Sequence, residues 1–442
     1  MCEYDFRISA AYSPAESQAS AQNDGGSSQH EEENDDGAVS DSGWSFNQLE
    51  DGSDLFPDFN DLQFLGSSPP GFPSLALGLE DQDMQLLSHY HTHTSQIMTF
   101  LPDELPVLQT EIPNLASSCG ALMHSLLALS AACLACDLLA SLDNETPAAS
   151  TGIATTIMRV QELLTAGDSH HAASMHEIQE YLVPNSSGSQ SLNAVLANAT
   201  LMAIYGSANH RAQAWLTRLT TSREESRVSS VAVLRFRWLF LFRAAHLAHR
   251  AFVGHQIQPS ASGESGLFNF VASADIGASP PGESPHPLLT ILCTTGPVAM
   301  DKLGESVLRG QRNDGDAVPS LNACATAFRV LNTIISTLGS NLGSSPLRRI
   351  VMSFLNRAPQ EYFDIIQMGH DQDTSNMRAR QLAMNILAHW LVLVMLLDEV
   401  WWIGDVGSWE LRYVLDELGW GADDYWPASM YQIVQDTKQR TI

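Results

Sequence analysis

The chain has 442 residues, of which 44% are hydrophobic, so it is long enough for more than one domain and has ample material for a core. It carries 50 acidic against 22 basic residues, and this net charge of −28 disfavours bare attraction to nucleic-acid backbones or anionic membranes. Six cysteines scattered over this length do not suggest a disulfide framework, and the first residues, MCEYDFRISA, do not follow the pattern of a signal peptide. We therefore expect a protein of a reducing compartment that is not a generic nucleic-acid binder.

Residues 1–83 are strongly acidic. They contain 18 acidic residues and one basic residue, Arg7, which gives a local charge of −17, and they are rich in Ser, Gly, Pro, Asn and Gln. Such a composition buries too little apolar surface to offset the entropy lost on ordering. The sequence therefore predicts a disordered, activation-like segment over residues 1–83.

Hydrophobic and acidic residues alternate within this segment, a pattern typical of activation segments. A short helix started by Asp54 would place Leu55, Phe56, Phe59 and Leu62 on one face, which is predicted to dock in a hydrophobic groove of a partner protein. The alternative is a solvated tail without a binding function. The predicted partner-binding residues are Trp44, Phe46, Leu55, Phe56, Phe59 and Leu62.

Helical periodicity begins at Met84, so residues 84–442 are predicted to form an all-α domain of several helices packed in antiparallel pairs. Two apolar runs, residues 112–136 and 382–397, are interpreted as buried core helices and not as membrane spans. Residues 254–286, rich in Ser, Gly and Pro, are predicted to be a surface loop. After the first helix, the predicted helices span Ser118–Leu142, Thr151–Ala166, Ala172–Leu182, Gln190–Tyr205, Ala212–Ser222, Val228–Phe252, Pro287–Leu308, Pro319–Leu338, Pro346–Leu355, Asn376–Trp402, Trp409–Leu418 and Ala428–Lys438.

Two short motifs contain residue types that bind metals. Cys133 and Cys136 form a single C-x-x-C inside an apolar stretch, so we interpret them as small core residues, with half a zinc site or a redox dithiol as the alternative. His89 and His93 would share a helix face and bind a metal weakly, but exposed helix positions explain the run better, since a metal site needs three or four converging ligands.

No motif of an enzyme is present. His176 and Glu177 begin like a zinc-protease motif, but Glu180 stands where the second histidine is required. The basic, aromatic stretch from Arg235 to Arg243 is interpreted as a core helix with one charged edge, because nucleic-acid binding usually needs a larger basic patch. We therefore expect a protein that is not an enzyme.

Strings near both ends of the helical part carry a resemblance to a known family. They are LLSHYHTHTSQIM from Leu86, IPNLASSCGALMHSLLALSAACLA from Ile112, and DEVWWIGDVGSWELRYVLDELGW with YWPASMYQI near the end. Together they resemble the fungal-specific transcription factor domain, the helical effector region of binuclear zinc cluster regulators. The sharpest element consists of Trp401, Trp402, Gly404, Asp405, Gly407, Trp409 and Glu410.

The resemblance implies a transcription regulator in the nucleus that acts through a coactivator or other transcription proteins, with a homodimer or heterodimer left open. The family's six closely spaced cysteines are missing from residues 1–83, so neither its zinc nor any other cofactor is expected, and DNA contact is expected to be indirect. Such a chain is either a shortened product or a regulator that works through another DNA-bound protein. A helical adaptor or small-molecule sensor unconnected with transcription is the alternative function, and no role in a membrane is expected.

Independently of the resemblance, five of the nine tryptophans fall within 26 residues, which indicates a packed corner between helices. Gly404 and Gly407 are predicted to let the chain turn there, Asp405 to hydrogen-bond the backbone, and Ser408 to cap the next helix. The alternative is an aromatic surface for a partner or ligand. The five tryptophans are Trp401, Trp402, Trp409, Trp420 and Trp426.

Overall fold

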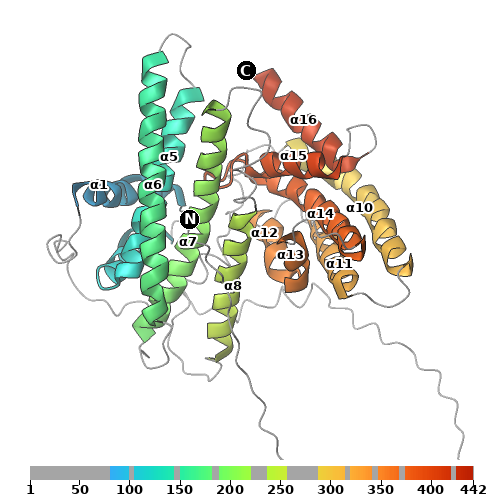
Figure 1. Ribbon diagram of the computed structural model, residues 1–442, viewed down its shortest axis with the longest axis horizontal. Helices are drawn as coiled ribbons and strands as arrows, with labels where there is room; N and C mark the ends of the chain where they lie inside the picture. Colours follow the sequence, from blue (N-terminus) through green and yellow to red (C-terminus); the bar gives the residue numbers. More distant parts are fainter. Residues whose placement is uncertain are drawn as a thin grey trace, which may run out of the picture. The chain divides into compact units, whose positions relative to one another are not determined.

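Helices account for nearly all residues that the computed structural model describes, and none of these residues belongs to a strand (Figure 1). The predicted all-α fold is thus confirmed for this part of the chain. The described residues belong to one unit, Phe56–Ile442. They are residues 80–98, 104–143, 150–181, 189–220, 236–255, 287–313, 319–340, 347–367, 374–419 and 425–441.

The first group of helices surrounds α5. Helix α5 packs against α1, α4, α6 and α7. Helix α8, which follows α7 in the chain, packs against α7. The only charged residues of α5 are Asp137 and Asp143, so α5 is apolar around most of its circumference, as a central helix must be. The elements are α1 (Asp81–His89), η4 (Tyr90–Thr94), α2 (Ser95–Met98), α3 (Glu104–Pro106), η5 (Val107–Glu111), α4 (Ile112–Ala116), α5 (Gly120–Asp143), α6 (Ser150–Tyr181), α7 (Ser189–Thr220) and α8 (Arg237–His255).

The second group surrounds α14, which packs against α10, α11, α12, α13, α15 and α16. Trp390 of α14 is fully buried, and its ring stacks between Phe354 of α12 and Trp238 of α8, with centroids 5.3 and 6.0 Å away. This aromatic stack joins the two groups of helices. The elements are α10 (Pro287–Asn313), α11 (Pro319–Ser340), α12 (Leu347–Arg357), α13 (Gln360–Gln367), α14 (Thr374–Val394), η7 (Met395–Leu397), α15 (Val406–Leu418) and α16 (Trp426–Thr441).

Two predicted helix breaks are wrong. The sequence predicts interruptions near Gly167 and Gly206, but α6 and α7 continue through them. A Cβ atom on Gly167 would lie 3.2 Å from the Tyr205 ring, and one on Gly206 would collide with Leu241 of α8. These glycines therefore allow neighbouring helices to approach closely, and the packing offsets the lower helix propensity of glycine.

Other boundaries differ from the prediction as well. The first helix begins at Asp81 and not at Met84, and α14 ends at Val394 and not at Trp402. The sequence does not predict α13. The described part of the helix predicted from Val228 begins at Arg237, after Phe236, whose φ of 61° is incompatible with a right-handed helix.

Two described helical segments, Gly120–Leu142 and Met377–Leu397, are long and apolar enough to span a membrane. Neighbouring helices bury most of each one, as they would bury the core helices of a folded domain.

Candidate functional site

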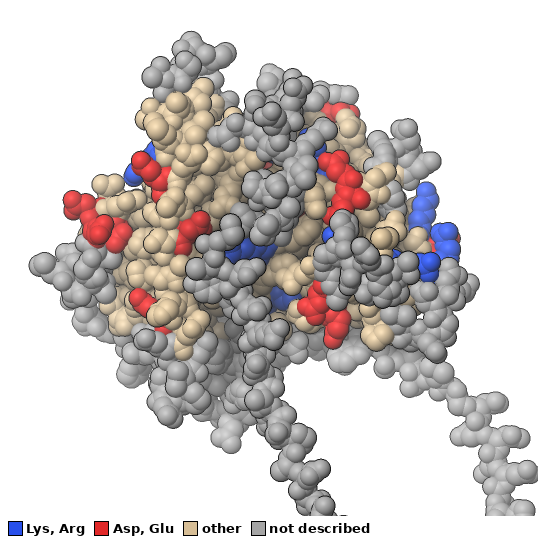
Figure 2. All heavy atoms as spheres, in the orientation of Figure 1, with Lys and Arg blue, Asp and Glu red and all other residues tan. Residues whose placement is uncertain are grey.

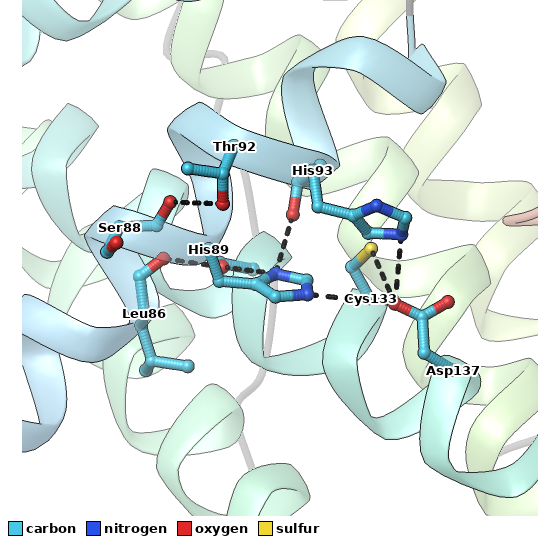
Figure 3. A network of polar contacts seen from close by, with 9 residues as sticks. Leu86, Ser88, His89, Thr92, His93, Cys133 and Asp137 are labelled. Atoms are coloured by element: carbon cyan, nitrogen blue, oxygen red, sulfur yellow. Dashed lines mark hydrogen bonds and ion pairs between the residues drawn. The ribbon is translucent and has the colours of Figure 1, made fainter. Parts of the chain in front are cut away.

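Four side chains with metal-binding atoms converge where the first helical segment meets α5 (Figure 3). They are His89, His93, Cys133 and Asp137, hereafter the four-ligand cluster, and their ligand atoms all lie within 4.8 Å of one another. Asp137 Oδ2 lies 3.1 Å from His93 Nε2, 3.6 Å from His89 Nε2 and 3.9 Å from Cys133 Sγ. The carboxylate thus lies close to all three other groups.

Helical spacing explains how each pair is formed. Cys133 and Asp137 are four residues apart on α5, so they share a face of that helix. His89 is the last residue of α1, and His93 lies in the wider π-helical turn η4, which follows it directly. Turns of this type occur frequently at functional sites. Packing of α1 and η4 against α5 then brings the two pairs together.

Hydrogen bonds orient the His89 ring. The Ser130 hydroxyl donates to the Leu86 carbonyl oxygen at 2.6 Å, so it accepts from His89 Nδ1 at 3.2 Å. Thr94 Oγ1 lies 3.0 Å from the same nitrogen. In the neutral ring these contacts assign the proton to Nδ1, so the lone pair of Nε2 points toward Asp137.

The cluster is buried on one side and open on the other. Cys133 is fully buried, and this burial raises the pKa of its thiol well above the usual range, with the nearby Asp137 carboxylate acting in the same direction. The side chains of His93 and Asp137 are each 43% exposed. The arrangement therefore combines a dry thiol with two ligands that an ion can reach from solvent.

The histidine run differs from its prediction. The sequence predicts exposed helix positions, whereas His89, His91 and His93 are half-buried. Cys133 and Cys136 are buried, as predicted, but only Cys133 belongs to the four-ligand cluster, since Cys136 donates to the Ala208 carbonyl oxygen. Asp137 is a site residue that the sequence analysis does not predict, although the sequence contains an H-x3-H and a C-x3-D pattern.

A second group of histidines lacks this convergence. His170 Nε2 lies 3.2 Å from Asp83 Oδ1, its Nδ1 lies 3.0 Å from His124 Nδ1, and His124 Nε2 lies 3.4 Å from Glu177 Oε1. These groups form a linear chain of contacts and share no common centre. Glu177 is therefore a partner of His124, consistent with the failed zinc-protease motif.

The motif from Trp401 to Glu410 includes the end of the turn between η7 and α15 and the first residues of α15, and residues of α7 contact it. Ser207 donates to the Trp402 carbonyl oxygen at 2.8 Å, and Arg211 donates to that of Trp401. Glu410 is 1% exposed and lies 2.6 Å from His210 Nε2. The Trp409 ring lies against the ring of His210, with centroids 5.1 Å apart. The described part of the motif thus connects α7 with α15.

The glycines and polar residues of the motif act partly as predicted. Gly404 has a φ of +47°, so the predicted turn depends on it. Gly407 is instead the second residue of α15, where a Cβ atom would lie 2.8 Å from the backbone nitrogen of Met395. Asp405 precedes α15 without a side-chain capping bond, and Ser408 lies inside the helix and donates to the Asp405 carbonyl oxygen. The predicted cap at Ser408 is therefore wrong.

The described end of the basic, aromatic stretch is structural. Arg243 of α8 is only 7% exposed, and its guanidinium donates to the carbonyl oxygens of Leu355 and Ala358 and to Gln360 Oε1. Its charge therefore faces the end of α12, as expected for a core helix with a charged edge.

The predicted partner-binding residues lie outside the described residues. They are Trp44, Phe46, Leu55, Phe56, Phe59 and Leu62. A comparison with protein-family models and with curated proteins finds no match for this chain.

Proposed function

We propose that this chain is a nuclear transcription regulator that acts through protein contacts. In this proposal residues 1–83 contact a coactivator, and the all-α domain controls that contact. The observation that carries the proposal is the alternation of acidic and aromatic residues between Trp44 and Leu65, within a segment of charge −17. The motif from Trp401 to Glu410, which resembles the fungal-specific transcription factor domain, supports it, and an all-α fold agrees with that resemblance.

We propose that any contact with DNA is indirect. The net charge is −28, and the six cysteines of the chain are too scattered for a binuclear zinc cluster. Figure 2 shows one face of the molecule, on which the basic side chains of the described residues occur in small, separate groups among acidic ones. Such a surface provides weak attraction for a phosphate backbone.

A small-molecule sensor is the alternative function, and one cleft beside the motif bears on it. Arg211, Trp215, Arg218, Asp405 and Trp409 contribute to its lining. Its interior has room for about one water molecule, far less than a drug-sized ligand needs. This cleft therefore gives the sensor function no support.

Fusion of residues 1–83 to a heterologous DNA-binding domain tests the proposal in a reporter assay. We expect activation, and we expect the Phe56→Ala, Phe59→Ala double variant to abolish it, because aromatic anchors fill pockets on the partner. Replacement of Asp54, Asp58 and Asp61 by Asn is the matched variant. It should reduce activation less, since exposed charges mainly keep the segment solvated and speed encounter.

The outcomes separate the two functions. A fusion that gives no reporter signal at normal protein levels contradicts activation by this segment and favours the adaptor function. Equal loss in both variants would indicate a simple electrostatic tail, in contradiction to a hydrophobic docking face.

A further inference from the structure

We propose that the four-ligand cluster, His89, His93, Cys133 and Asp137, binds one zinc ion that fastens the first helical segment of the domain to α5. This inference is independent of the proposed transcriptional function. It also departs from the expectation, drawn from the sequence, that the chain carries no zinc.

The distances between the ligand atoms fit an ion with tetrahedral coordination. With zinc bonds of about 2.0–2.3 Å, neighbouring ligand atoms of a tetrahedron lie about 3.3–3.8 Å apart. The contacts of Asp137 Oδ2 with His93, His89 and Cys133, at 3.1, 3.6 and 3.9 Å, are close to this range. Even the most distant pair of ligand atoms, within 4.8 Å, needs to contract by only about 1 Å.

The chemical types of the four ligands indicate which metal the cluster would bind. Two imidazoles, a thiol and a carboxylate are ligands typical of zinc, whereas Ca²⁺ and Mg²⁺ prefer sites made of oxygen atoms. Four protein ligands fill the coordination sphere, which is the pattern of a structural site and leaves no open position for catalysis. On binding, the Cys133 thiol proton passes to solvent and the thiolate bonds the ion.

The surroundings of His89 resemble those of a metal ligand. Ser130 and Thr94 hold Nδ1, so the free lone pair of Nε2 faces the carboxylate of Asp137 at 3.6 Å. In the neutral ring, these two electron-rich atoms face each other, and a cation between them would turn their repulsion into two bonds. In metal sites, the ring nitrogen of a ligating histidine that does not bind the metal usually donates a hydrogen bond to another group.

The ion would add a bonded link between two parts of the fold that Ser130 of α5 also connects, through its hydrogen bonds with Leu86 and His89. His89 and His93 belong to the segment Asp81–Met98, whereas Cys133 and Asp137 belong to the central helix. Because metal binding stabilises whichever state contains the formed site, zinc should hold this segment in its packed position.

Metal analysis of the purified full-length chain gives the first test. After dialysis against metal-free buffer, we expect about one zinc per chain, the stoichiometry of a single four-ligand site. His93→Ala should weaken zinc affinity by at least about 100-fold, since even partners outside the coordination sphere contribute 10- to 100-fold. Cys133→Ser should show a similar loss.

Two neighbouring residues provide matched controls. His91 lies between the two histidines but outside the cluster, and Cys136 belongs to the same C-x-x-C as Cys133 but bonds Ala208. His91→Gln and Cys136→Ser should therefore keep their zinc. Loss of zinc from these controls to the same extent as from His93→Ala would overturn the assignment of the ligands.

Co²⁺ provides a spectroscopic test of the thiolate bond. The cobalt-loaded chain should show a sulfur-to-cobalt charge-transfer band that Cys136→Ser retains and Cys133→Ser loses. If Cys133→Ser does not fold, His93→Ala, which changes a half-exposed side chain, decides the question by metal content alone. Hydrogen exchange of residues 81–98 should also become faster when a chelator removes the ion.

A wild-type chain that binds zinc no more tightly than His93→Ala would overturn the proposal. In that case, the cluster would be a group of hydrogen bonds between histidines and a carboxylate, without an ion.

Discussion

Replacement of Arg243 by Met should destabilise the helical domain, because this buried cation completes the end of α12. Its Nη1 donates to the carbonyl oxygens of Leu355 and Ala358 at 2.8 and 2.7 Å, and its Nε donates to Gln360 Oε1 at 2.6 Å. In a continuing helix, the carbonyl of Leu355 would accept from the backbone nitrogen of residue 359. That residue is Pro359, which has no N–H group, so Arg243 supplies the missing donor.

The size of the expected stability loss follows from the polar groups that lose their hydrogen-bond partner in Arg243→Met. Methionine matches much of the length of arginine but cannot donate, so the two buried carbonyls lose a charged partner. Each such group is expected to destabilise the fold by about 1–3 kcal/mol, and the stacking of the guanidinium on Phe363, at 4.5 Å, is lost as well. Burial of methionine in place of a charge offsets part of this. We expect a net decrease of about 3 kcal/mol in the free energy of unfolding.

Urea denaturation followed by circular dichroism measures this change as a lower midpoint with an unchanged slope. The urea midpoint of Arg243→Lys should lie between those of the wild type and Arg243→Met, because a single ammonium group cannot reproduce the several N–H donors of the guanidinium. Arg309→Met is the matched control. Arg309 is 72% exposed and lies 3.9 Å from an equally exposed Glu305, so its loss should change the free energy by about 0–0.5 kcal/mol. A midpoint of Arg243→Met equal to that of the control would refute the structural role.

Two further substitutions test buried positions of α14 and α15. Burial lowers the pKa of His389 to about 4, below the ordinary value of 6.5, so the unfolded chain binds this proton first, and stability is lost as the pH falls below about 6.5. His389→Gln should therefore reduce the slope of the free energy of unfolding, measured by urea denaturation, against pH between 6.5 and 4, by up to about 1.4 kcal/mol per pH unit. Parallel curves for the variant and the wild type would contradict this. Gly407→Ala should destabilise the domain by at least about 2 kcal/mol, because the new Cβ atom would lie 2.8 Å from the Met395 nitrogen and 2.9 Å from the Val394 carbonyl carbon. At Gly339 a Cβ atom meets nothing within 4 Å, so Gly339→Ala should leave stability unchanged or increase it slightly, and similar losses in both variants would contradict the steric explanation.

The periodicity of the sequence predicts the helices well because it depends on local spacing, but it fails where a residue acts through a distant neighbour. Gly404 could be predicted as a turn residue, since the positive φ that it adopts is a local property. Gly167 and Gly206 have the same local signal and a different cause, namely contact with Tyr205 and Leu241. Only the packing of the helices distinguishes a glycine that ends a helix from one that permits close contact.

The four-ligand cluster could not be predicted from the sequence for a similar reason, because it depends on residues from helical segments that are distant in the sequence. The sequence displays two pairs of residues four apart, His89 with His93 and Cys133 with Asp137, and each pair alone has too few ligands for a metal site. The apolar stretch around Cys133 favours the interpretation that it is a core residue. Burial and metal ligation, however, do not exclude each other. A dry environment removes water as a competing ligand and strengthens the attraction between a thiolate and a cation. The property that makes Cys133 resemble a core residue in the sequence is therefore also the property that would make it an effective ligand. It could act as one because Asp137 lies one turn away on the same helix and packing brings His89 and His93 close to them.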